Sequence, residues 1–126
     1  MNEVCKPTTD STFSFIRHKQ PHDLDVYAWA TSVQWAVTSI RNAGALSQMI
    51  LLPGTGYTAA GGFVSSGSAA ALSAVQNPDG SKTNLIFDVH QYLDSDFSGT
   101  HIDCTSNGVG NLASLATYLR SNGRQA

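Results

Sequence analysis

The sequence predicts an α/β fold in which parallel strands alternate with helices. Two short apolar runs, at residues 48–52 and 84–90, are bounded by turn residues, as is typical of strands buried in a parallel sheet. Segments with the helical spacing of apolar residues precede, separate and follow these runs. The order helix, strand, helix, strand, helix is the pattern of βαβ units with right-handed crossovers.

The first helix is expected to begin after Asp25, which is a good N-cap residue. Its apolar positions fall on one face, and residues 42–44 (Asn-Ala-Gly) supply a stop signal. Trp29 and Trp35 lie on this helix, where we expect them to pack into the core rather than to bind a ligand. The apolar positions are Val26, Trp29, Ala30, Val33, Val37 and Ile40.

The remaining elements follow from the same two signals, hydrophobic period and turn residues. A strand buried on both faces is expected at 48–52, ended by Pro53, and the Gly-Thr-Gly at 54–56 is interpreted as a plain turn because it lacks the further glycine of a nucleotide-binding loop. A helix is expected at 68–75, a turn at 77–80 and a second buried strand at 84–90. The last helix is predicted at 111–119, with Gly123 beyond its end and one apolar face formed by Leu112, Leu115, Ala116 and Leu119.

The overall charge excludes several classes of partner. The 126 residues carry a formal net charge of -2, and their basic residues are scattered, whereas nucleic acids and anionic membranes require a clustered basic face. The longest apolar run is far shorter than the roughly 20 residues that span a bilayer. No signal peptide is recognised at the start, so the chain as written is expected to be cytoplasmic.

No cofactor or metal site is expected from the sequence. Cys5 and Cys104 are interpreted as free thiols in preference to a disulfide. Residues 94–99 resemble the first half of a calcium loop, but Thr105 stands where a bidentate Glu is needed, so a polar loop is the preferred interpretation. The four histidines, His18, His22, His90 and His101, lack the close spacing of a zinc motif.

Asp88, His90 and Tyr92 form the strongest candidate site. They alternate along the end of the second strand, so their side chains share one face at the carboxyl end of a parallel sheet, where α/β proteins place their active sites. Tyr and His at such a position can orient or stabilise a carboxylate. The alternative is that both are ordinary packed and hydrogen-bonded side chains.

The segment Phe87–Asp96, followed by Ser-Gly-Thr-His at 98–101, resembles the sixth strand and following loop of fungal glycoside hydrolase family 5 endo-β-1,4-glucanases. Pro21-His22-Asp23-Leu24, Ile40–Gly44, Leu52-Pro53-Gly54 and Asn77–Gly80 resemble the same family in the same order. This resemblance covers residues 21–126. It implies a partial (β/α)₈ (TIM) barrel of about three βα units, from the end of strand 4 to helix 6.

The resemblance also implies a disrupted catalytic motif. The family's fourth strand ends in Met-Asn-Glu-Pro, and its Glu is the acid/base of a retaining glycosidase, but Pro21 here follows Gln20, which cannot exchange a proton. The chain opens with Met-Asn-Glu, so Glu3 is the acid/base candidate, displaced by an insertion from Val4 to Gln20. We expect residues 1–20 to be a split motif with a non-family insert. A translated intron is our hypothesis for this insert, because Val codons begin with GT and Gln can be encoded by CAG.

By resemblance, the substrate-binding residues are His90 and Tyr92, which line the -1 subsite, and His22, which lies beside the acid/base strand. The family's nucleophilic Glu is not found in residues 1–126. Retaining hydrolysis needs two carboxyl groups, so we expect a fragment with little or no activity on β-1,4-glucan by itself. The alternatives are a non-catalytic glucan-binding or protein-interaction module, or a truncated product without selected function. The family is secreted, and open sheet edges would favour self-association.

Overall fold

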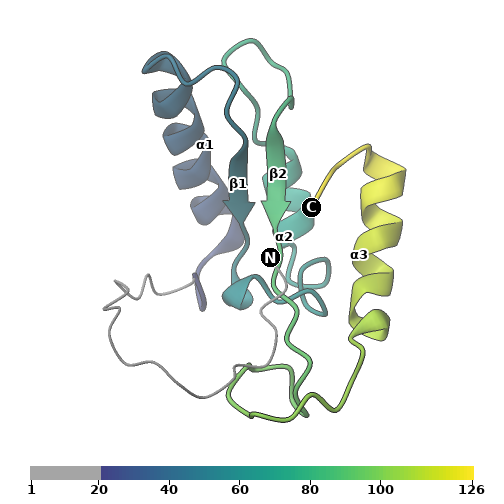
Figure 1. Ribbon diagram of the computed structural model, residues 1–126. Helices are drawn as coiled ribbons and strands as arrows, with labels where there is room; N and C mark the ends of the chain where they lie inside the picture. Colours follow the sequence, from purple (N-terminus) through teal and green to yellow (C-terminus); the bar gives the residue numbers. More distant parts are fainter. Residues whose placement is uncertain (1–20) are drawn as a thin grey trace.

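The computed structural model describes residues 21–126 and confirms the predicted α/β order. Figure 1 shows two strands lying side by side, with α1 next to β1 and α3 on the side of β2. A short 3₁₀ turn, η1, follows the first strand. The elements are α1 (Val26–Asn42), β1 (Ile50–Pro53), η1 (Gly56–Thr58), α2 (Ser68–Ser73), β2 (Leu85–Asp88) and α3 (Val109–Asn122).

The two strands are parallel, in a register that pairs Ile50 with Leu85 and ends with Pro53 opposite Asp88. Leu52, Leu85 and Phe87 are buried on the face that the helices cover, whereas Leu51 is 53% exposed on the other face. The expectation that the first strand is buried on both faces is therefore wrong for the described part of the chain. A parallel sheet is normally covered on both sides, and here the helices cover one.

The core lies between this covered face and the helices. It is a single cluster in which the Phe63 and Phe87 rings lie 5.4 Å apart at a tilt of 45°. Aromatic pairs at such a separation add to the stabilisation from burial alone. Its larger members are Val33, Val37, Leu52, Phe63, Leu72, Val75, Leu85, Phe87 and Leu115.

The first helix forms as its sequence predicts. The side chain of Asp25 accepts hydrogen bonds from the backbone N–H groups of Tyr27 and Ala28, which satisfies donors that lack a partner within the helix. The Trp29 indole is half-buried and donates from Nε1 to the Pro53 carbonyl at 2.7 Å, so α1 is tied to the end of β1. Trp35 is 70% exposed, so the expectation that it packs into the core is wrong.

The later helices differ from expectation mainly at their ends. Gly123 adopts left-handed backbone angles at the end of α3, where a stop signal was predicted. Gly67 adopts similar angles at the start of α2. Helix α3 is longer than predicted. Its Leu115 is buried, but Leu112 is 39% exposed, so the predicted apolar face is only partly covered.

The chain after α3 returns to the edge of β2. The Phe87 N–H donates to the Gln125 carbonyl at 2.9 Å. The Arg124 guanidinium lies over the Phe87 ring, 4.7 Å from its centroid, and is buried. Burial lowers the pKa of Arg124. The residues after α3 therefore begin to add a third segment beside the second strand.

Cys104 is disulfide-bonded, so the interpretation of this residue as a free thiol is wrong; Cys5 lies outside the described residues. A disulfide requires its two cysteines to be close in the tertiary structure, which residue spacing cannot reveal. Among residues 21–126, no helix is both long and apolar enough to cross a membrane.

Candidate functional site

The carboxyl end of β2 brings together the three residues predicted there. His90 Nε2 lies 3.5 Å from Asp88 Oδ1, and both side chains are largely but not fully buried. The rings of His90 and Tyr92 meet edge to face, with centroids 6.5 Å apart. The predicted proximity of Asp88, His90 and Tyr92 is thus confirmed, and it follows from the alternation of side chains along an extended chain.

The backbone of His90 is fixed by the segment that follows β1. Its N–H donates to the Thr58 carbonyl at 2.9 Å, and its own carbonyl accepts from the Ala60 N–H at 2.9 Å. These bonds continue the parallel pairing beyond the end of the strands, with Ala59 opposite His90. The backbone that carries the imidazole is therefore held by a second chain segment.

His22 lies on the other side of the same segment. The Tyr57 N–H donates to the Pro21 carbonyl at 2.9 Å. The His22 ring stacks on the Tyr57 ring, with centroids 4.6 Å apart and 17° between planes. His22 Nδ1 also lies 2.8 Å from Asp23 Oδ2. Residues 57–60 thus contact both the His22 and the His90 segments, so all these side chains lie at the carboxyl end of the sheet.

Tyr57 is the residue that the sequence argument missed. It is 54% exposed although its ring is large and one face is stacked on His22. Its backbone is in the left-handed region, at φ 60°, which a bulky residue seldom adopts. The signal that could have identified it is its position, an aromatic residue in the loop that follows the carboxyl end of a parallel strand.

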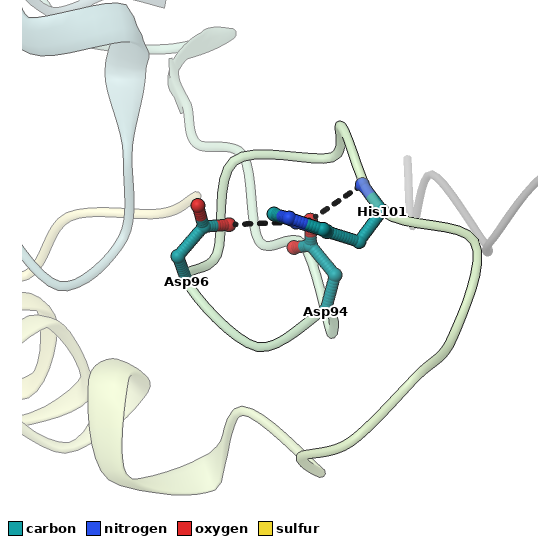
Figure 2. A group of neighbouring side chains, drawn as sticks. All are labelled: Asp94, Asp96 and His101. Atoms are coloured by element: carbon teal, nitrogen blue, oxygen red, sulfur yellow. Dashed lines mark hydrogen bonds and ion pairs between the residues drawn. The ribbon is translucent and has the colours of Figure 1, made fainter.

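The loop after Tyr92 is organised around a buried carboxylate. Asp94 is 1% exposed, and it accepts hydrogen bonds from the backbone N–H groups of Gly99 and His101, both at 3.1 Å. Ser98 Oγ donates to it at 3.3 Å. Figure 2 shows His101 lying between the carboxylates of Asp94 and Asp96, with Nδ1 at 3.2 Å and 3.3 Å from them.

These contacts change the ionisation of the loop. Burial opposes the charged form of Asp94, but the hydrogen bonds from Gly99 and His101 outweigh it and hold the pKa of this carboxyl well below its usual range. The hydrogen bond to Asp94, followed by the charge of Asp96, raises the pKa of His101. The loop is therefore stabilised by an ion pair over the pH range in which His101 is protonated.

Asp94, Asp96 and His101 are also close enough to share a cation, since one possible ligand atom from each lies within 4.8 Å of the others. The hydrogen bonds among them already account for their arrangement.

A separate hollow of about 420 Å³ lies at the opposite end of the sheet. Arg41, Asn77 and Ser81 are among the residues that line it, and these precede the strands in the chain. Ligands of parallel α/β sheets bind at the carboxyl ends of the strands. We therefore propose no ligand for this hollow.

Glu3, the predicted acid/base, lies outside the described residues, as does the rest of the predicted insert from Val4 to Gln20. The structure thus places His22, His90 and Tyr92 but leaves the role of Glu3 a prediction. The division of the chain at residue 20 also stays a prediction.

Comparisons with known proteins agree with this architecture. The model of the family described as "Cellulase (glycosyl hydrolase family 5)" matches residues 1–126. The chain is 63% identical over 108 residues to endoglucanase EG-II of Hypocrea jecorina, an alignment that covers 85% of this chain and 26% of that protein.

Solved structures give the same result. The crystal structure of Cel5A (EG2) from Hypocrea jecorina superposes with a TM-score of 0.82 at 62% identity, over 85% of this chain and 33% of that one. The structure of XacCel5A in complex with cellopentaose superposes with a TM-score of 0.71 at 39% identity, over 83% and 34%. The chain thus spans about a quarter to a third of the relatives it matches, and the predicted partial (β/α)₈ barrel is confirmed.

Proposed function

Because the chain belongs to the cellulase family, glycosyl hydrolase family 5, we propose that residues 1–126 form part of the substrate site of a retaining endo-β-1,4-glucanase. The observation that carries this proposal is the convergence of His22, His90 and Tyr92 at the carboxyl end of parallel strands. Active sites of (β/α)₈ barrels lie at that face. XacCel5A, one of the structural relatives, binds cellopentaose, so a β-1,4-glucan is the proposed ligand.

Each of these side chains suits the recognition of a sugar. The imidazoles of His22 and His90 and the phenol of Tyr92 can exchange hydrogen bonds with sugar hydroxyls. Tyr57 adds a half-exposed aromatic ring beside His22, and carbohydrate rings present apolar C–H faces to such surfaces. We propose that Tyr57 supports one glucosyl unit of the bound chain, next to the unit that His90 and Tyr92 contact.

Hydrolysis with retention requires two carboxyl groups about 5 to 5.5 Å apart. Glu3 is the proposed acid/base, and the family's nucleophile has no counterpart that we identify within residues 1–126. We therefore propose that this part of the chain binds glucan and carries the acid/base, and that hydrolysis needs a second carboxylate from outside it.

Two measurements on the 126-residue chain test this. Cellopentaose binding, followed by isothermal titration calorimetry, is expected for the unmodified chain and is expected to weaken in Tyr57→Ala. Tyr27→Ala is the matched control, because Tyr27 is an aromatic residue on α1 that is 67% exposed. Equal losses in both variants, or no binding at all, would contradict the proposal.

Reducing-sugar release from carboxymethyl-cellulose tests the catalytic half. We expect none above background, and a Glu3→Gln variant run alongside excludes a contaminating cellulase. Release that disappears in Glu3→Gln would show that a second carboxylate is present within the chain, and Asp88 would then be the first to substitute.

We further propose that Val4 to Gln20 is a translated intron that separates Glu3 from Pro21. The resemblance of residues 1–3 and of residues 21–24 to adjacent parts of one family motif supports this. The genomic codons provide the test. A codon for residue 4 that starts with GT and a CAG codon for residue 20 are expected, together with a transcript that lacks the segment; CAA at residue 20 would overturn it.

A further inference from the structure

We propose that Asp94 is a positioning residue that fixes the ring of Tyr92, because it holds the loop 94–101 against that ring. This inference deepens the proposed function, on which it rests, by adding a residue that acts on the glucan site without touching the glucan. The Asp94 carboxylate is buried, and the proposed glucan site gives it no other role.

The first step is the anchoring of the loop. Asp94 immediately follows Leu93, whose carbonyl accepts the N–H groups of Thr105 and Ser106 at 2.8 Å and 3.1 Å. These two bonds close the base of the loop. From inside it, the Asp94 carboxylate accepts the N–H groups of Gly99 and His101 and the Ser98 hydroxyl. A carboxylate that binds several N–H groups of one loop restricts its backbone to one conformation.

The second step is the contact of the loop with Tyr92. A Cβ atom placed on Gly99 would lie 2.4 Å from Cδ1 and from Cε1 of the Tyr92 ring. The ring therefore packs directly on the Gly99 backbone, which a side chain at this position would prevent. Gly99 also has φ 73°, a conformation that favours glycine. Since Asp94 accepts the Gly99 N–H at 3.1 Å, the carboxylate and the ring both contact Gly99.

The third step leads from the ring to the site. Tyr92 meets His90 edge to face at 6.5 Å, and His90 is bound through its backbone to residues 58 and 60. His90 is thus fixed from the strand side, and Tyr92 is fixed from the loop side. A loosened loop would leave the His90 backbone in place but remove the packing of the Tyr92 ring against Gly99.

The chain offers a matched control for this role. Asp96 belongs to the same loop and also contacts His101, but its side chain is 57% exposed, and the backbone N–H that it accepts is that of Ser98. Asp94→Asn and Asp96→Asn remove the same charge from the same loop. Only the first places an amide where two backbone N–H groups need an acceptor.

The test combines NMR with cellopentaose titration of the 126-residue chain. We expect contacts between the Gly99 Hα and the Tyr92 ring protons in the free chain, which Asp94→Asn removes and Asp96→Asn retains. We also expect Asp94→Asn to weaken cellopentaose binding about five- to tenfold, the effect of one lost hydrogen bond, and Asp96→Asn to change it less than about twofold.

A double-substitution cycle separates positioning from general stability. If Asp94 acts through Tyr92, adding Asp94→Asn to Tyr92→Ala costs no further affinity; an equal loss in both backgrounds overturns the proposal. Gly99→Ala, which leaves the carboxylate intact but displaces the ring, is expected to reproduce the loss. If the unmodified chain does not bind cellopentaose, the proposed function fails, while the Gly99–Tyr92 contacts still decide the positioning role.

Discussion

Arg41 joins the end of α1 to the segments that lead into both strands. The residue is 5% exposed, and its Nε donates to Asn77 Oδ1 at 2.9 Å. Nη1 donates to the carbonyls of Ala45 and Gln48, which lie between α1 and β1. Asn77 in turn donates to the carbonyl of Thr83, shortly before β2. One side chain therefore organises the amino-terminal end of the sheet.

The expected cost of Arg41→Met follows from these bonds. A hydrogen bond from a charged donor contributes about 1.5 to 3 kcal/mol, and an unsatisfied buried donor costs about 1 to 3 kcal/mol. Arg41 makes three such bonds, but its Nη2 is buried without a partner in the described part of the chain. Methionine has a long unbranched side chain but no donor. The substitution therefore removes the three hydrogen bonds and also the unpaired Nη2, and it leaves the three acceptors without a partner from residue 41. We expect the free energy of unfolding to fall by roughly 3 to 5 kcal/mol.

Urea unfolding followed by far-UV circular dichroism measures this change. Arg120→Met is the matched control, because Arg120 also lies in the last turn of a helix but is exposed; it should change stability by less than about 0.5 kcal/mol. Arg41→Lys, which keeps the charge but not the planar fork of donors, should fall between the two. If Arg41→Met and Arg120→Met were equally stable, the reasoning from buried hydrogen bonds would be refuted.

Three further changes test other parts of the fold. Gly54→Ala would place its Cβ 2.7 Å from the Phe63 ring and should lower the melting temperature through a cost of about 1 to 3 kcal/mol; Gly110→Ala, in α3 with open space around it, should raise it. Leu51→Lys should reduce self-association through the uncovered sheet face, measured by sedimentation equilibrium; unchanged association would point to another surface. Because the pKa of Asp94 is lowered in the folded chain, its stabilising effect should be complete above about pH 4 and disappear as the pH falls further. The stability difference between the unmodified chain and Asp94→Asn should therefore shrink as the pH falls from about 4 to about 2, and a constant difference would contradict this.

Local sequence patterns were sufficient to predict the helices and strands and to identify the family. The Asp25 cap, the helical spacing that follows it and the stop at residues 42–44 predicted α1 closely, because helix formation depends on residues within a turn or two. The alternation at the end of the second strand likewise predicted that Asp88, His90 and Tyr92 would meet. Such features depend on residues that are close in sequence, so they can be predicted without the tertiary structure.

Contacts between distant segments were decided only by the tertiary structure. Nothing in the spacing of residues predicts that Tyr57 stacks on His22, or that Cys104 is disulfide-bonded. The exposure of Trp35 and Leu51 depends on which faces the other elements cover, and this is a property of the whole arrangement. The burial of Asp94 is the clearest case. The sequence around Asp94 is that of a polar loop. Only the folded loop, closed at Leu93, brings the N–H groups of Gly99 and His101 to the carboxylate and so makes its burial favourable.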